Sequence, residues 1–155
     1  MKKFLFILFL FLSIIFLSAE QEEGILKIDI KVSPYRLAKG QEGKVVLKLD
    51  VEEGISINPQ PSFIIEFEPA DELIFPKDFY TASDLEIKIS KENGREFLIF
   101  SDPVEIPFTM NLEAKPGKHQ LKGKIKYFAS CKEEEWCLKS STEFKVEFYT
   151  RSRHP

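Results

Sequence analysis

A period-two alternation of apolar and polar residues constrains the fold of this chain more than any other feature. It is clearest at residues 26–32, which read LKIDIKV. Because successive side chains of a β-strand point to opposite faces, such a segment places one face on a core and the other in water. Segments of the same character recur along the chain, at residues 45–51, 63–67, 85–89, 104–112, 121–127 and 144–148, and residues 97–100 form a short continuous apolar run.

The connections between these predicted strands carry turn residues. Asn93-Gly94 separates two apolar runs and favours a two-residue β-hairpin turn, and Pro116-Gly117 marks another turn. Pro107 falls inside a predicted strand, which must be bulged there or lie at a sheet edge, because proline has no N–H to donate. Residues 58–62 and 69–84 are predicted to be long loops. No stretch of ten or more residues has helical spacing, so the predicted fold class is an all-β antiparallel sandwich.

The first nineteen residues have the composition of an export signal. Two lysines precede an apolar run from Phe4 to Leu17, and small residues follow up to Ala19. Since a membrane-spanning helix needs about 20 apolar residues, residues 1–19 are predicted to be a signal peptide cleaved near Ala19, with a retained anchor as the alternative. Residues 20–155 are predicted to be a single periplasmic domain without a membrane span.

The charge balance narrows the expected partners. The chain has 22 Lys plus Arg against 25 Asp plus Glu, a formal net charge of -3, which becomes -5 without the two lysines of the export signal. The chain has no basic cluster with which to neutralise phosphates. Nucleic acid is therefore not an expected partner.

Chemistry in this domain would centre on its two cysteines. Cys131 and Cys137 flank the segment KEEEW in one connection between two predicted strands, so one intramolecular disulfide is possible. The residues leave two interpretations open, a structural staple or a redox-active pair, since exposed loop disulfides are the more easily reduced. A bridge within one hairpin connection restrains little that the hairpin does not already hold. Trp136 would either contact a partner or pack over the bridge.

A metal site is a weaker interpretation, and no cofactor is expected. Two sulfurs need further ligands, but the two histidines are His119, in a predicted turn region, and His154, in the C-terminal tail. A copper site would have to recruit Met110 as a soft ligand.

The cysteine connection resembles that of the N-terminal periplasmic domain of DsbD-type thiol:disulfide interchange proteins. The matching residues are the strand end from Tyr127 to Cys131, five intervening residues of which Trp136 is the last, and Cys137. Asp78-Phe79-Tyr80 matches the acidic residue and the Phe-Tyr pair of that family's cap loop. The resemblance covers nearly all of residues 20–155. It implies an immunoglobulin-like antiparallel β-sandwich.

The resemblance also implies an electron relay. Domains of that family accept two electrons from a thioredoxin-like domain and pass them to exported thiol proteins, such as disulfide isomerases and cytochrome c maturation factors. It implies that Cys137 forms the mixed disulfide with a partner and that Cys131 resolves it. Within the cap loop, Phe79 would shield the cysteine pair with Tyr80 beside it, and Asp78 would assist proton transfer.

The sequence therefore predicts an exported thiol-disulfide exchange domain, a component of protein-disulfide reduction. Cys131 and Cys137 would relay electrons between thioredoxin-like exported proteins. The sequence contains no transmembrane electron carrier and no thioredoxin-like domain, so separate partners are expected, with a membrane electron carrier among them. The alternative is a non-enzymatic exported β-sandwich with the disulfide as a staple. It would bind a partner through the Pro-rich segment Pro59-Gln60-Pro61 and through exposed Phe79, Tyr80 and Trp136.

Overall fold

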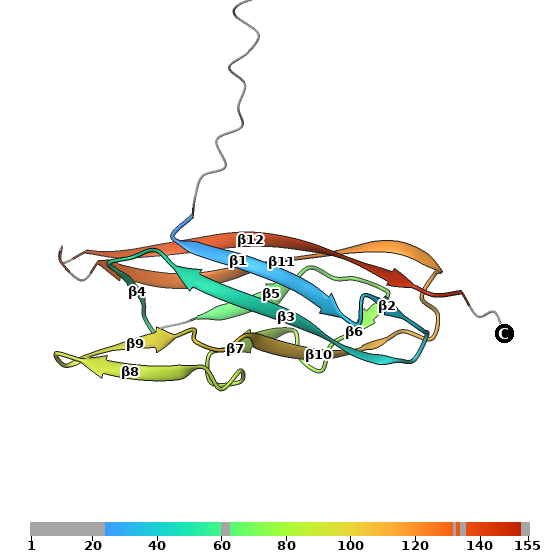
Figure 1. The fold of residues 1–155 in the computed structure, drawn as a ribbon, viewed down its shortest axis with the longest axis horizontal. Coiled ribbons are helices and arrows are strands. Elements are labelled where there is room, and N and C mark those ends of the chain that lie inside the picture. Colours follow the sequence, from blue (N-terminus) through green and yellow to red (C-terminus); the bar gives the residue numbers. More distant parts are fainter. Residues whose placement is uncertain (1–23, 60–62, 132, 134–135, 153–155) are drawn as a thin grey trace, which may run out of the picture.

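The computed structural model describes residues 24–59, 63–131, 133 and 136–152, and every regular element within them is a β-strand. The strands are β1 (Leu26–Ser33), β2 (Arg36–Leu37), β3 (Glu42–Val51), β4 (Ile55–Ile57), β5 (Ile64–Phe67), β6 (Leu73–Ile74), β7 (Phe79–Thr81), β8 (Lys88–Glu92), β9 (Arg95–Ile99), β10 (Val104–Met110), β11 (Gly117–Cys131) and β12 (Cys137–Thr150). The all-β class predicted from the alternation is confirmed. The longest strands run along the long axis of the molecule (Figure 1).

These strands form two main sheets and a separate hairpin. The first sheet has the order β1-β3-β10-β6 and is antiparallel. The second has the order β2-β12-β11-β5-β7, with β4 also pairing with β11, and β2 runs parallel to β12. Strands β8 and β9 pair with each other. The two main sheets enclose one core, so the fold is an immunoglobulin-like antiparallel β-sandwich.

The core is built from the inward positions of the alternating strands. Val45, Leu47 and Leu49 of β3 are at most 2% exposed, and Leu121 and Ile125 of β11 are fully buried. Each such side chain contributes about 1.5–3 kcal/mol by leaving water. A one-residue slip in pairing would turn the whole set outward, so this burial fixes the register of β11. That register decides how the cysteine at the end of β11 is presented.

Gly123 lets the second sheet close around its aromatic residues. A Cβ at this position would overlap the carbonyl oxygen of Glu66 and would lie 2.5 Å from the Phe144 ring. Phe144 occupies the space above the glycine and meets the ring of Phe67 edge-on, with ring centroids 5.7 Å apart. The missing side chain therefore permits the close approach of β5 to β11.

Several turn and edge predictions are confirmed. Asn93 and Gly94 have φ values of 50° and 75°, as the turn of a tight hairpin requires. Pro107 pairs with β3, while β6 pairs with β10 only at Thr109 and Met110. Within the described residues, Pro107 thus lies on a stretch of β10 whose other edge has no neighbouring strand, where its missing N–H costs nothing.

Two predictions about connections are wrong. Residues 69–84, predicted to be a long loop, contain β6 and β7, and β7 joins the edge of the second sheet. Alternation cannot reveal strands of two or three residues. The strand predicted over residues 85–89 begins only at Lys88, because Glu86 adopts a left-handed φ of 54°. Of the predicted loop 58–62, residues 60–62 lie outside the described part.

The predicted signal peptide, residues 1–19, also lies outside the described residues. Within the part of the chain that the structure describes, no helix has the length and apolar character needed to cross a membrane.

Candidate functional site

The β11–β12 hairpin brings the two cysteines to its tip. The two strands pair continuously from Gly117 opposite Thr150 to Ser130 opposite Cys137. One step further, the backbone N–H of Cys131 donates a hydrogen bond to the carbonyl oxygen of Trp136 at 3.3 Å. Both cysteines are thiols in the structure. They are thus diagonal neighbours across the last rungs of the ladder.

The register places the two cysteine side chains on opposite faces of the hairpin. Along β11, Tyr127 and Ala129 are buried in the core, and Cys131 continues this inward series as a half-buried residue. Cys137 lies opposite Ser130, which belongs to the outward series, and it is exposed. Residues that are directly opposite share a face of the sheet. A disulfide between the cysteines therefore requires the tip of the hairpin to rearrange.

Trp136 lies on the inward face with Cys131. Its side chain is half-buried and packs against the core. It also lines the open cleft described below, so partner contact and packing over a bridge both stay predictions for Trp136.

A chain of polar side chains reaches the sulfur of Cys137. Asn58 follows β4, and its Nδ2 donates to Cys137 Sγ at 3.7 Å. The oxygen of the same amide, Oδ1, accepts a hydrogen bond from Ser130 Oγ at 2.9 Å. Ser56 Oγ lies 3.2 Å from Ser130 Oγ, because β4 pairs with β11 so that these two serines are directly opposite. Sequence reasoning missed all three residues, since nothing in their spacing links them to the cysteines.

Both cysteines line an open cleft of about 860 Å³. One wall is the end of the second sheet, and the other is the β8–β9 hairpin, whose tip lies at the same end of the molecule (Figure 1). The lining residues are Ser56, Asn58, Pro59, Glu92, Asn93, Arg95, Glu96, Phe97, Ser130, Cys131, Glu133, Trp136 and Cys137. The cleft is therefore mainly polar and carries more acidic than basic side chains, with Phe97 and Trp136 as aromatic surfaces.

The structure does not bring the predicted cap residues to the cysteines. Tyr80 pairs with Ile65 of β5, which in turn pairs with Ile125 of β11, six residues before Cys131. At about 3.3 Å per residue, this separation is about 20 Å of strand. None of the residues 78–80 lines the cleft. Among the described residues, those that line the cleft across from the cysteines come from the β8–β9 hairpin.

The three predicted cap residues differ in exposure. Asp78 is exposed and the Phe79 side chain is 51% exposed, whereas Tyr80 is buried against the core. Burial raises the pKa of the Tyr80 hydroxyl above its ordinary value. Tyr80 is therefore a core residue, and Phe79 is an exposed aromatic on an edge strand.

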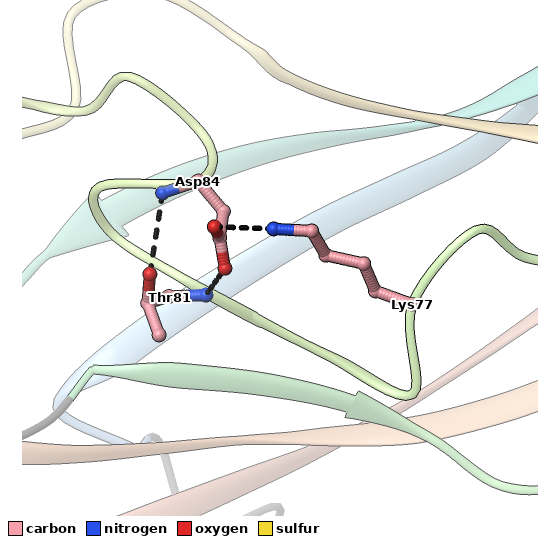
Figure 2. Close-up of polar contacts among 3 residues, drawn as sticks. All are labelled: Lys77, Thr81 and Asp84. Carbon is pink, nitrogen blue, oxygen red and sulfur yellow. Dashed lines mark hydrogen bonds and ion pairs between the residues drawn. The ribbon is translucent and has the colours of Figure 1, made fainter.

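A compact hydrogen-bonded turn follows the predicted cap residues (Figure 2). Asp84 accepts hydrogen bonds from Lys77 Nζ and from the backbone N–H of Thr81, and its own N–H donates to Thr81 Oγ1. The Lys77 contact and the Thr81 N–H lower the pKa of Asp84 from 3.8 to about 2. Lys77 thus serves to hold this turn.

Met110 and His119, which were weighed for a metal site, lie apart from the cysteines, and His154 is outside the described residues. Met110 is fully buried, and its sulfur accepts a hydrogen bond from Thr150 Oγ1 at 3.5 Å. Thr150 is thirteen residues from Cys137 along β12, which is about 40 Å of strand. His119 lies between the Glu72 carboxylate and the Lys115 carbonyl. Among the described residues, no three His, Cys, Asp or Glu side chains gather in a group that could hold a metal ion.

Comparison with known proteins supports no family assignment. No protein-family model matches the chain, and no curated protein matches it. Among solved structures it is similar to the sporulation control protein Spo0M of Bacillus subtilis, at 12% identity and a TM-score of 0.38, over 84% of this chain and 51% of that one. It is also similar to a conjugative transposon lipoprotein of Bacteroides eggerthii, at 14% identity and a TM-score of 0.38, over 80% and 96% of the two chains.

A third similar structure is the cohesin module of a family 33 glycoside hydrolase from Clostridium perfringens, at 14% identity and a TM-score of 0.39, over 83% of this chain and 98% of that one. This chain thus spans about half the length of the sporulation protein and nearly all of the other two. Likeness at this level carries no inference about function.

Proposed function

We propose that this protein is an exported thiol-disulfide exchange domain that relays electrons between thioredoxin-like proteins through Cys131 and Cys137. The observation that carries the proposal is the position of both cysteines at one hairpin tip, lining an open cleft. A disulfide there is a poor staple, because β11 and β12 are already paired from Gly117 to Ser130. The cysteine spacing that resembles DsbD-type domains is a second support.

The exposed Cys137 is the sulfur that exchanges with a partner. In the reduced protein, the Cys137 thiolate attacks a partner disulfide and forms a mixed disulfide, and the partner's other sulfur leaves as a thiolate that takes up a proton. The Cys131 thiolate then attacks Cys137 Sγ, forms the internal disulfide and releases the partner's second thiolate. Two electrons and two protons pass to the partner. The reverse sequence reduces this protein.

The cleft suits exchange with a folded protein rather than catalysis on a small molecule. It is open, and its walls are polar side chains with two aromatic surfaces. Residues 1–19 have the composition of a signal peptide, which favours an exported location where disulfides persist. We therefore infer that the partners are thioredoxin-like exported proteins and that a separate membrane electron carrier supplies reducing equivalents.

Trapping the mixed disulfide tests the proposal. The variant Cys131→Ser retains Cys137 but cannot resolve an adduct. We expect it to form a stable disulfide-linked adduct with an exported thioredoxin-like protein that keeps only its first active-site cysteine, presented as a mixed disulfide with 2-nitro-5-thiobenzoate, so that the partner has no second thiol to reverse the exchange. The adduct is seen by mass spectrometry and is lost on adding dithiothreitol. The matched variant Cys137→Ser, which keeps only the half-buried Cys131, should trap far less. If Cys131→Ser traps none of the candidate proteins, the relay is refuted in favour of a stapled binding module.

A further inference from the structure

The contacts of Cys137 point to a function for Asn58. The Asn58 amide lies between a hydroxyl group that donates to its oxygen and a sulfur that accepts from its nitrogen. Asn58 and Ser130 are both half-buried, so the amide is less mobile than one on an open surface. The side chain of the residue that follows β4 is thus directed at the sulfur that the proposed reaction uses.

The Asn58 amide presents its donor group to the sulfur. In the structure its oxygen faces Ser130, which donates to it at 2.9 Å, and its NH₂ group faces Cys137 Sγ. Because a thiolate can only accept hydrogen bonds, this is the orientation that suits the ionised sulfur. Ser56 Oγ lies 3.2 Å from Ser130 Oγ and donates to the Ser130 carbonyl oxygen at 3.5 Å, so it packs against Ser130 beside the amide. The donation from Ser130 to the amide oxygen polarises the amide and strengthens its N–H donors.

Resting on the proposed thiol exchange, we propose that Asn58 stabilises the Cys137 thiolate and that Ser130 is a positioning residue that holds the amide in the donating orientation. A thiolate is a stronger hydrogen-bond acceptor than a thiol, so the contact favours the ionised form. The same hydrogen bond stabilises the negative charge that develops on Cys137 Sγ when Cys137 is displaced from a mixed disulfide. The acidic lining of the cleft, which includes Glu92, Glu96 and Glu133, acts against a thiolate. A neutral donor directed at the sulfur offsets that effect without adding a charge.

The test uses Cys131→Ser protein, in which Cys137 is the single thiol. Its thiolate absorbance near 240 nm and its alkylation rate by iodoacetamide are measured across pH. Asn58→Asp has the same shape and keeps the acceptor for Ser130, but it replaces the donor by a carboxylate oxygen. We expect the thiolate fraction at pH 7 to fall about tenfold in this variant. Alkylation should slow by only about threefold, because a less stabilised thiolate is intrinsically more nucleophilic.

Two further variants distinguish loss of the hydrogen bond between Asn58 and Cys137 from a general disturbance of folding. Asn58→Ala removes the donor without adding a charge and should show a smaller loss in the same direction, while Ser130→Ala should reproduce part of it. In all of these variants the alkylation rate at high pH, where the thiol is fully ionised, should not fall. The control is Gln120→Ala, which removes an exposed amide from β11 outside the cleft and should leave the pH profile of Cys137 unchanged.

Identical pH profiles for Asn58→Asp, Asn58→Ala and the parent protein would overturn the inference. That result would leave the exchange function intact if the mixed disulfide still forms. Conversely, an altered pH profile without any trapped partner would refute the exchange function while the contact between Asn58 and the thiolate stands.

Discussion

Oxidation of the cysteine pair should reorganise the tip of the β11–β12 hairpin. Cys131 faces inward and Cys137 faces outward, so the two sulfurs can meet only if one strand gains or loses a residue in the pairing at the tip. This change removes the hydrogen bond from Cys131 N–H to the Trp136 carbonyl and turns Trp136 away from the core.

The cost follows from these contacts. A lost backbone hydrogen bond costs about 0.5–1.5 kcal/mol, and partial exposure of a tryptophan side chain adds about 1 kcal/mol. A total of about 1.5–2.5 kcal/mol raises the reduction potential by about 30–55 mV, since about 30 mV corresponds to 1.4 kcal/mol for a two-electron couple. The Cys131–Cys137 disulfide is thus expected to be more easily reduced than a disulfide that forms without any change in strand pairing.

Trp136 is the single tryptophan of the chain and reports this change directly. We expect its fluorescence to shift to longer wavelength on oxidation, and amide exchange at residues 131 and 137 to speed up. The matched control combines Cys131→Ser with Ser130→Cys, which places the second sulfur directly opposite Cys137. The backbone pattern makes positions 130 and 137 a non-hydrogen-bonded pair, with Cα atoms about 4.5 Å apart, a separation that a disulfide accommodates.

The control should therefore oxidise without a change in Trp136 emission and at a lower potential. If the native pair also oxidises with unchanged Trp136 emission and unchanged amide protection, the opposite-face geometry does not govern the chemistry and the reasoning is refuted.

Three further predictions concern the surrounding fold. Gly123→Ala should destabilise the domain by about 1–3 kcal/mol through overpacking, seen as a lower denaturation midpoint; an unchanged midpoint would contradict the packing described. Because the pKa of Asp84 is lowered, the contribution of its carboxylate to stability is present above pH 3.8 and is lost as the pH falls through about 2. An NMR titration should find the Asp84 midpoint near 2, and Lys77→Met should raise that midpoint. If Lys77→Met leaves the Asp84 midpoint unchanged, the ion pair between Lys77 and Asp84 does not cause the lowered pKa. The resemblance assigns shielding of the thiols to Phe79, but the aromatic residue that lines the cleft with them is Phe97 and not Phe79. Phe97→Ala should therefore speed oxidation of the thiols by small oxidants, while Phe79→Ala should not. The opposite result would favour the predicted cap.

Much of the fold could be predicted because burial leaves a local signal. The alternation of residues 26–32 and 45–51 identified β1 and β3, and Asn93-Gly94 identified the turn of the β8–β9 hairpin. Strands β6 and β7 could not be found in this way, because two or three residues are too few to show a period. These two short strands form because β6 pairs with β10 and β7 pairs with β5, each at the edge of a main sheet.

The candidate site was likewise predictable from the sequence only in part. Cys131 and Cys137 stood out by residue type and spacing, but Asn58 reaches Cys137 only because β4 pairs with β11. The opposite-face arrangement depends on the pairing register at the tip, which the spacing of the cysteines alone does not specify. Long-range pairing of this kind leaves no local pattern, and for the same reason the wall of the cleft formed by Phe97 was not anticipated.

Counting thiols after exposure to a donor tests the central claim most directly. The oxidised protein is incubated with a reduced thioredoxin, quenched with acid, alkylated and weighed by mass spectrometry. The account predicts that two alkyl groups are added per molecule, one at each cysteine, within the time that the donor needs to reduce a known exchange partner. A bridge that remains closed, with no alkyl group added, would contradict it.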